Sequence, residues 1–362
     1  MNILILTGRF GMGHYSAARA LQEQLLAVCP NAHVAVRDVF ADAFGGSTGL
    51  LYKAYTLFIS RGGKIYNQIY RRSERTGDTV GIPLRPVFLR TLGHILAEKR
   101  YDAVISTLPF TSQLMSEYKS RYGDSTPLVT CITDVSIHGD WLAPGTDAYL
   151  VATERTRSAL TAMGAPRDSI FVTGVPVRPG FSPSGRVPAA NRREVLITGG
   201  GLGLLPDSIG FYRALNTLPG LHATVICGDN ASLRERLEGR FENITVLGFV
   251  PDMENYLRHS DLVVGKPGGV SVFEAIACRV PFLAFRPFLA QEVYNAGYIS
   301  AEGLGAVLEC EPRQCIEQLY ELIFDDMRLA EMRRNMDRQV SMRDSGALSR
   351  LLRGLENPGC CA

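Results

Sequence analysis

Short apolar segments alternate with helical patterns along most of the chain. The apolar segments lie at residues 3–6, 34–36, 103–106, 128–133 and 148–151, and after residue 190 at 195–197, 223–227, 244–247, 262–264 and 281–285. Most are apolar throughout, which is typical of parallel strands buried on both faces. The stretch from Ser16 to Leu26 is rich in good helix formers. The pattern therefore predicts an α/β fold with two doubly wound parallel sheets.

A proline-rich stretch separates the two groups of strands. Residues 176–188 hold four prolines and two glycines, which neither a helix nor a central strand tolerates. We therefore expect a first domain at residues 1–178, a linker at 179–193 and a second domain at 194–324. The charged tail at 325–362 should form surface helices, and packing back on the first domain is one option for it.

The composition excludes several classes of protein. Of 362 residues, 46% are hydrophobic and 20% are charged, so the chain can bury two cores. The net charge of +2 argues against a nucleic-acid binder, which needs a basic excess. No run of about 18 apolar residues and no signal peptide is evident. The eight cysteines are scattered, so we expect a reduced, cytoplasmic protein.

The segment at residues 50–72 departs from the α/β pattern. It combines tyrosines, a phenylalanine and many aliphatic residues with cations, and residues 52–100 hold ten Lys or Arg against three acidic residues. Such a segment can lie on an anionic membrane, with apolar side chains at the acyl boundary and cations among the headgroups. An ordinary helical hairpin with a buried aromatic face explains the composition equally well.

A glycine-rich turn, T-G-R-F-G-M-G-H at residues 7–14, follows the first predicted strand. Glycines such as Gly13 let backbone amides approach a ligand closely, and the following helix favours negative charge at its start. His14 stands where open α/β sheets place their ligands, and there an imidazole can take a proton from a hydroxyl nucleophile. A capping or supporting histidine is the alternative.

A second polar cluster, T-D-V-S-I-H-G-D-W, occupies residues 133–141 directly after a strand. Asp134 could orient His14 or act as a base itself, and Trp141, the only tryptophan, offers an apolar wall. Asp134 and His138 could also bind a metal, but nothing nearby completes a ligand set.

The second predicted domain carries two glycine loops after its strands. The first, at residues 198–203, includes Gly200; the second, G-K-P-G-G-V-S at 265–271, opens a helix. Backbone amides at Gly268, Gly269 and Val270, with the Ser271 hydroxyl, suit a diphosphate at a helix N-terminus. Glu274, one turn further, can accept both ribose hydroxyls.

Two more groups of residues could complete a nucleotide-sugar site. Phe249 and Val250 follow another strand and could present main-chain groups to a base edge. Gln291, Glu292 and Asn295 gather polar side chains that can bond to sugar hydroxyls. Neither glycine loop is a Walker A sequence.

Taken in this order, these motifs resemble those of GT-B glycosyltransferases. More closely, they resemble the monogalactosyldiacylglycerol synthase and processive diacylglycerol glucosyltransferase family, which is glycosyltransferase family 28-like. The run K-P-G-G-V-S-V-F-E-A at residues 266–275 carries most of the likeness, and the cluster at 133–141 narrows it to the lipid-glycosylating branch. The implied fold is two Rossmann-like domains with an interdomain cleft.

The resemblance implies a function for each group of residues. The reaction would move a hexose from a UDP-sugar to a lipid hydroxyl with inversion, using His14 or Asp134 as the base. Phosphate would bind at Gly268, Gly269 and Ser271, ribose at Glu274, uracil at Phe249 and Val250, and the sugar at Gln291, Glu292 and Asn295. No cofactor and no obligate metal is implied, and the place of action would be the inner face of the cell membrane.

This sequence departs from the family pattern at several substrate-facing positions. Leu108-Pro109 replaces His-Pro, Phe10 and Met12 enter the first glycine loop, and Leu289-Ala290 replaces Pro-Gly. Two other functions therefore stay open: a UDP-sugar-dependent transferase for a soluble natural-product or cell-wall precursor, and a UDP-sugar epimerase.

Overall fold

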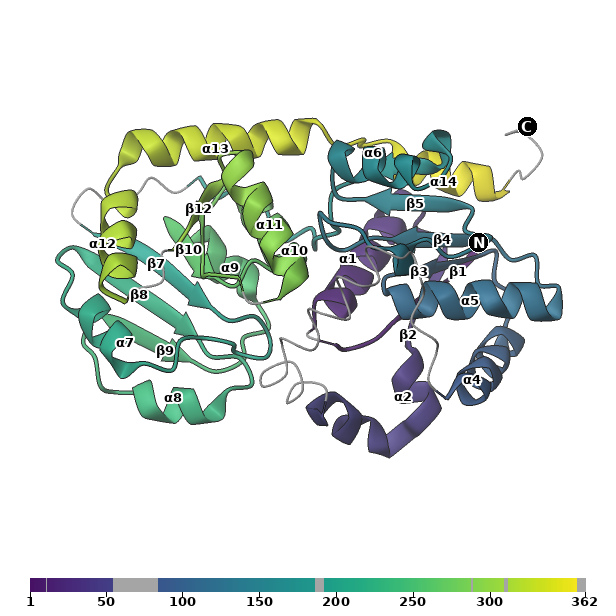
Figure 1. Ribbon diagram of the computed structural model, residues 1–362, viewed down its shortest axis with the longest axis horizontal. Coiled ribbons are helices and arrows are strands. Elements are labelled where there is room, and N and C mark those ends of the chain that lie inside the picture. Colours follow the sequence, from purple (N-terminus) through teal and green to yellow (C-terminus); the bar gives the residue numbers. More distant parts are fainter. Residues whose placement is uncertain (11, 55–83, 186–191, 288, 309–311, 357–362) are drawn as a thin grey trace. The chain divides into compact units, whose positions relative to one another are not determined.

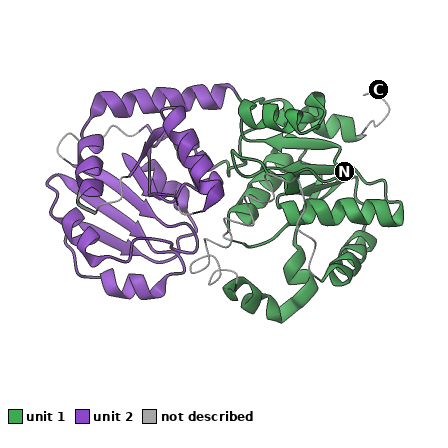
Figure 2. Ribbon diagram, in the orientation of Figure 1, with its two compact units in different colours: residues 1–179, 343–362 green, residues 180–342 purple. Residues whose placement is uncertain are grey.

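The structure, a computed structural model, describes residues 1–362 except 11, 55–83, 186–191, 288, 309–311 and 357–362 (Figure 1). The chain forms two compact units (Figure 2). Unit 1 comprises residues 1–179 and 343–362, and unit 2 comprises residues 180–342. Of the predicted membrane-facing segment at 50–72, everything beyond residue 54 lies outside the described residues.

Unit 1 is built on a six-stranded parallel sheet. Its strands are β1 (Asn2–Thr7), β2 (His33–Asp38), β3 (Ala103–Ser106), β4 (Leu128–Cys131), β5 (Ala148–Val151) and β6 (Ile170–Val172), in the order β2-β1-β3-β4-β5-β6. Its helices are α1 (Gly13–Val28), α2 (Val39–Phe44), α4 (Arg85–Glu98), α5 (Pro109–Tyr122), α6 (Glu154–Ala162) and α14 (Ala347–Glu356). The strand order reverses between β1 and β3, which is where sheets of this kind bind ligands.

The two faces of this sheet are covered by different helices. Ile3 and Ile5 of β1 pack with α1 and α14, whereas Leu4 and Leu6 pack with α2, α4 and α5. Successive side chains of a strand point to opposite faces, so an apolar β1 needs helices on both sides.

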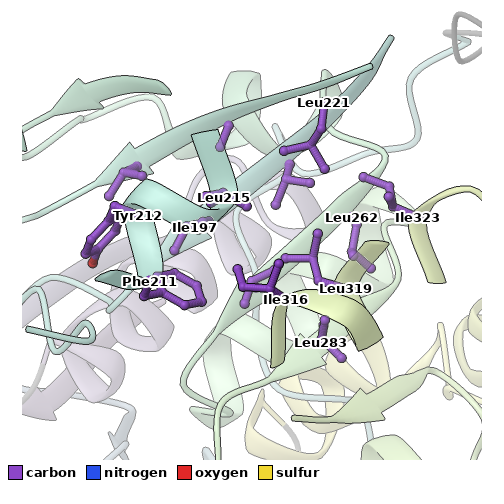
Figure 3. Close-up of a cluster of buried hydrophobic side chains, with 14 of the residues drawn as sticks. Ile197, Phe211, Tyr212, Leu215, Leu221, Leu262, Leu283, Ile316, Leu319 and Ile323 are labelled. Carbon is purple, nitrogen blue, oxygen red and sulfur yellow. The ribbon is translucent and has the colours of Figure 1, made fainter. Parts of the chain in front are cut away.

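Unit 2 repeats the same architecture. Its strands are β7 (Arg193–Thr198), β8 (Leu221–Ile226), β9 (Ile244–Leu247), β10 (Leu262–Gly265), β11 (Phe282–Ala284) and β12 (Gly305–Val307), in the parallel order β12-β11-β10-β7-β8-β9. Its helices are α7 (Ile209–Asn216), α8 (Ala231–Leu237), α9 (Met253–Arg258), α10 (Gly269–Cys278), α11 (Ala290–Ala301), α12 (Pro312–Ile323) and α13 (Asp326–Ser341). Side chains of α7 and α12 fill one face of the sheet around Leu262 (Figure 3).

The charged tail at residues 325–362 contributes to both units. Leu329 and Met332 of α13 join the core of unit 2, whereas Leu351 and Leu352 of α14 join the core of unit 1. The chain re-enters unit 1 where the Asp344 N–H donates to Val172 O at 2.8 Å. The apolar faces of the two helices therefore assign them to different units.

The sequence pattern missed the strands β6 and β12. Each has three residues and lies at the edge of its sheet, where a short apolar run carries little signal. Among the described residues, no helix is long and apolar enough to cross a membrane. The five cysteines that the structure describes, Cys29, Cys131, Cys227, Cys278 and Cys315, are free thiols.

Candidate active site

His14 lies at the point where the strand order of unit 1 reverses. It is the second residue of α1, which follows β1 across the glycine-rich turn. Met12, the N-cap of α1, adopts a left-handed conformation with φ of 66°. The turn thus reverses the chain sharply and sets His14 beside Thr107, directly after β3.

The hydrogen bonds of His14 fix which ring nitrogen carries the proton. Nδ1 lies 2.8 Å from the carbonyl oxygen of Thr107 and 3.0 Å from Thr133 Oγ1. Because a carbonyl oxygen can only accept, Nδ1 must carry the hydrogen in the neutral ring. Nε2 is therefore the nitrogen that holds the free lone pair, as a general base requires.

The surroundings of His14 keep it neutral. Burial is the main cause that lowers its pKa below the usual 6.5, and the charge of His138 adds to it. Asp134 and the hydrogen bond to Thr107 act in the opposite direction but do not offset burial. A neutral imidazole near pH 7 is ready to accept a proton.

The loop after β4 brings the second predicted cluster to the same place. Asp134 acts electrostatically on His14, so the structure unites the two candidate bases. The Trp141 ring is buried, with its centroid 6.3 Å from His14 and 6.2 Å from His138, and His138 Nδ1 lies 3.4 Å from Asp140 Oδ2. Among the described residues no group of three or more His, Cys, Asp or Glu could hold a metal.

Sequence reasoning assigned no role to Thr107 or to the hydroxyl of Thr133. Both are buried and both contact His14 Nδ1, one by its backbone and one by its side chain. Their position one or two residues after a strand is the signal that could have identified them, because polar residues there face the ligand edge of a parallel sheet.

The two glycine loops of unit 2 meet at the second strand-order reversal, between β7 and β10. Gly265 of β10 is paired with Thr198 of β7 so closely that a Cβ atom would stand 2.6 Å from the Thr198 carbonyl oxygen. Gly200 lies two residues after Thr198, has φ of 70°, and leaves open space where a Cβ atom would stand. Gly203, with φ of 63°, closes the turn through a 2.9 Å bond to Gly200 O.

The start of α10 offers backbone donors, though not all of those predicted. The first intrahelical bond runs from Val272 N to Gly268 O, so the N–H groups of Gly269, Val270 and Ser271 precede it. The Gly268 N–H instead donates to Lys266 O at 2.8 Å, which removes it from the set of free donors. Helix N-termini with such donors favour anions.

The side chains expected to contact a sugar differ in their placement on α11. Asn295 is completely buried and donates to Pro267 O at 2.9 Å, and Glu292, 6% exposed, pairs with Lys266 at 2.7 Å. Both therefore support the loop before α10. Gln291 is half-buried, and its side-chain oxygen is enclosed without a hydrogen-bond partner in the described structure.

The remaining predicted residues of unit 2 are spread along the sheet edge. Glu274 is half-buried in α10. Phe249, which is 61% exposed, and Val250 follow β9, the edge strand, which β7 and β8 separate from β10. The structure thus places them at the ligand edge of the sheet but away from the strand-order reversal.

Two sequence families match the two halves of the chain. The model of the monogalactosyldiacylglycerol (MGDG) synthase family matches residues 14–177, and that of the glycosyltransferase family 28 C-terminal domain matches residues 195–346. The processive diacylglycerol beta-glucosyltransferase of Bacillus cereus strain AH187 is 28% identical over 347 residues, covering 92% of this chain and 88% of that protein. The enzyme of the same name from Bacillus thuringiensis strain Al Hakam has the same identity and coverage.

Solved structures share the fold at low sequence identity. MurG of Acinetobacter baumannii superposes with a TM-score of 0.63 at 15% identity, over 98% of this chain and 99% of that one. The spinosyn rhamnosyltransferase SpnG gives 0.64 at 18%, over 98% and 100%. A UDP-GlcNAc 2-epimerase of Neisseria meningitidis gives 0.62 at 13%, over 99% and 100%, so the fold alone does not separate transferases from epimerases.

Proposed function

Because the chain belongs to the monogalactosyldiacylglycerol synthase and processive diacylglycerol glucosyltransferase family of GT-B glycosyltransferases, we propose that it transfers a hexose from a UDP-sugar to a lipid hydroxyl, such as that of diacylglycerol. Transfer would proceed with inversion at the anomeric carbon. The observation that carries this proposal is His14, neutral and held by Thr107 so that Nε2 is the free nitrogen.

In the proposed reaction, unit 1 supplies the base. His14 Nε2 takes the proton of the acceptor hydroxyl while that oxygen forms a bond to the anomeric carbon. The bond between this carbon and the UDP oxygen breaks, and UDP leaves with the electron pair. Asp134 favours the imidazolium that forms, since its charge raises the pKa of His14. If Asp134 were itself the base, His14 would have only an orienting role.

Unit 2 would hold the donor. The amides of Gly269, Val270 and Ser271 suit the diphosphate, and their fixed dipoles stabilise the charge that builds up as UDP departs. The binding of ribose by Glu274 and of uracil by Phe249 and Val250 stays a prediction from the resemblance.

Of the three residues proposed for sugar contact, Gln291 has the strongest support. Its enclosed oxygen is an acceptor for a sugar hydroxyl. We assign Asn295 and Glu292 to holding the loop before α10 instead, because their side chains are buried and bonded there. The proposed reaction needs no obligate metal, which stays a prediction from the resemblance.

A lipid acceptor requires contact with a membrane surface. Leu50 and Leu51 are exposed apolar side chains in helical residues 48–54, and the neighbouring Lys53 is an exposed cation. Exposed leucines beside a cation fit an anionic lipid surface. We propose peripheral binding to the inner face of the cell membrane through the segment at 50–72.

A donor and acceptor panel tests the proposed function. The purified chain is mixed with UDP-glucose, UDP-galactose or UDP-GlcNAc and with diacylglycerol in anionic vesicles, and products are identified by mass spectrometry. We expect a glycosylated diacylglycerol from one donor. His14→Ala should lower turnover by about 10²- to 10⁴-fold, the usual contribution of a general base. Its affinity for UDP, measured by calorimetry, should stay within about twofold, because UDP binds on unit 2.

Three outcomes would contradict the proposal. Glycosylation of soluble alcohols but not of diacylglycerol would indicate a soluble acceptor. A new sugar formed from UDP-sugar alone would indicate an epimerase. Full turnover by His14→Ala would remove His14 from the reaction.

A further inference from the structure

The turn that presents His14 contains a strained residue. Met12 has φ of 66°, a conformation that costs a residue with a side chain roughly 1–2 kcal/mol. Such a conformation persists only where the surroundings hold the chain on both sides. On the side of His14, Thr107 and Thr133 provide that hold.

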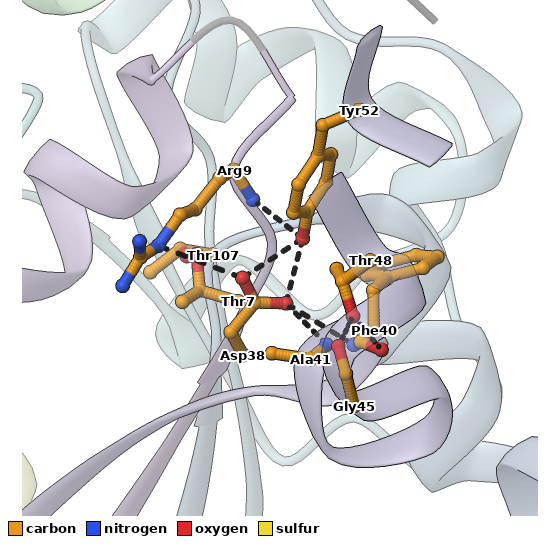
Figure 4. Close-up of polar contacts among 9 residues, drawn as sticks. All are labelled: Thr7, Arg9, Asp38, Phe40, Ala41, Gly45, Thr48, Tyr52 and Thr107. Atoms are coloured by element: carbon orange, nitrogen blue, oxygen red, sulfur yellow. Dashed lines mark hydrogen bonds and ion pairs between the residues drawn. The ribbon is translucent and has the colours of Figure 1, made fainter. Parts of the chain in front are cut away.

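On the other side of Met12, a tyrosine from a distant part of the sequence binds the turn. The Tyr52 hydroxyl accepts a hydrogen bond from the Arg9 N–H at 3.0 Å (Figure 4). It lies 2.7 and 2.8 Å from the two carboxylate oxygens of Asp38 and donates to that carboxylate. The three residues form what we name the Tyr52 clamp: the Tyr52 hydroxyl, the Asp38 carboxylate and the Arg9 backbone N–H.

The carboxylate of the clamp is itself fixed. Asp38 ends β2 and caps α2, accepting from the N–H groups of Phe40 at 3.1 Å and Ala41 at 3.2 Å. Its side chain is only 7% exposed. A buried carboxylate with three donors has little freedom to move, so it gives the Tyr52 hydroxyl a rigid support.

Apolar packing holds the same turn. The Phe10 ring meets Phe40 and Tyr52 edge-on, with centroids 4.6 and 4.9 Å apart. Thr48 Oγ1, 2.7 Å from Gly45 O, fixes the start of the helical residues that carry Tyr52. Burial is the main cause that raises the pKa of Tyr52, so its hydroxyl stays protonated and able to donate.

We propose that Tyr52 and Asp38 are positioning residues, which hold the turn after β1 in the conformation that aims His14 at its substrate. This inference rests on the proposed function, in which His14 is the base. Among the described residues, Arg9, Phe10 and the strained Met12 connect the clamp to His14 along the chain. Loss of the clamp should therefore let the turn relax without removing any group that binds the donor.

Tyr52→Phe is the sharpest test, because it removes one hydroxyl and keeps the ring that packs on Phe10. We expect kcat to fall about 5- to 30-fold, since small misplacements of a catalytic group are costly. The KM for the UDP-sugar should not change. Asp38→Asn, whose amide oxygen can still accept, should show a smaller loss.

Two further measurements separate positioning from general damage. Water that enters around a loosened His14 would reduce the burial that lowers its pKa, so the acid limb of kcat/KM should move to higher pH in Tyr52→Phe. In the background of His14→Ala, Tyr52→Phe should cause no further loss, because it acts through the imidazole. Tyr212→Phe is the matched control: it removes a buried hydroxyl bonded to Pro206 O at 2.9 Å in unit 2.

The outcomes distinguish the inference from the function on which it rests. Normal kcat in a folded Tyr52→Phe protein, with His14→Ala inactive, would overturn the clamp alone. An equal fall of kcat in Tyr52→Phe and Tyr212→Phe would overturn it too. So would a further fall of kcat when Tyr52→Phe is added to His14→Ala. Full activity of His14→Ala would instead overturn the proposed function.

Discussion

Asn295→Ala tests how the loop before α10 is prepared for the donor. Asn295 is completely buried, and its amide donates to the Pro267 carbonyl oxygen at 2.9 Å. Pro267 directly precedes Gly268, the N-cap of α10. The hydrogen bond therefore holds the residues that lead into the proposed diphosphate site.

The expected magnitude follows from the carbonyl group that the substitution leaves behind. A buried acceptor without its donor costs about 1–3 kcal/mol. If this free-energy cost destabilises only the conformation that binds UDP, the affinity for UDP falls by about 5- to 150-fold. If the cost instead lowers the free energy of unfolding of unit 2, the melting temperature drops by about 2–4 °C for each kcal/mol.

Calorimetric titration with UDP and a thermal melt, on the same preparation, separate the two effects. Asn335→Ala is the matched control, because it removes an amide bonded to Gly303 O at 3.0 Å elsewhere in unit 2. We expect both variants to lose stability, and Asn295→Ala alone to lose UDP affinity. Unchanged UDP affinity in Asn295→Ala would refute the assigned role, and direct contact of Asn295 with the sugar would lower UDP-sugar affinity but not UDP affinity.

Two further predictions concern the base and the lipid surface. Asp134→Asn removes a charge that raises the pKa of His14, so the acid limb of the kcat/KM profile should move to lower pH. Complete loss of turnover in this variant would instead indicate that Asp134 is the base. In flotation with anionic vesicles the chain should bind, and Leu50→Asp should weaken binding several-fold because Leu50 is 73% exposed. Met327 of unit 2 is 84% exposed, so the Met327→Asp protein is the control and should bind normally. Weaker binding of both variants, or of neither, would contradict the proposed surface.

The sequence predicted the central strands well, because their signal is local. Strands such as β1, β3 and β10 are continuous apolar runs ended by a glycine or a hydroxyl residue. The edge strands β6 and β12 need their neighbours to define them, so three residues alone gave no prediction.

The sequence predicted those parts of the candidate site whose position depends on the local backbone. It predicted less well the parts whose position depends on how distant elements pack together. The K-P-G-G motif predicted the start of α10, and His14 and Asp134, which the sequence offered as alternative bases, interact electrostatically. The burial of Asn295 and the use of the Gly268 N–H depend on which elements pack together. The same holds for the contact of Tyr52 with Asp38, which lie 14 positions apart.

The return of the chain to unit 1 through α14 determines the order of events during synthesis. Leu351 and Leu352, which complete the core around α1, leave the ribosome after unit 2, which is one uninterrupted stretch. Unit 2 can finish folding while the unit that carries His14 still lacks α14. The core beside α1, the helix that carries His14, is thus completed only after all of unit 2 has been translated.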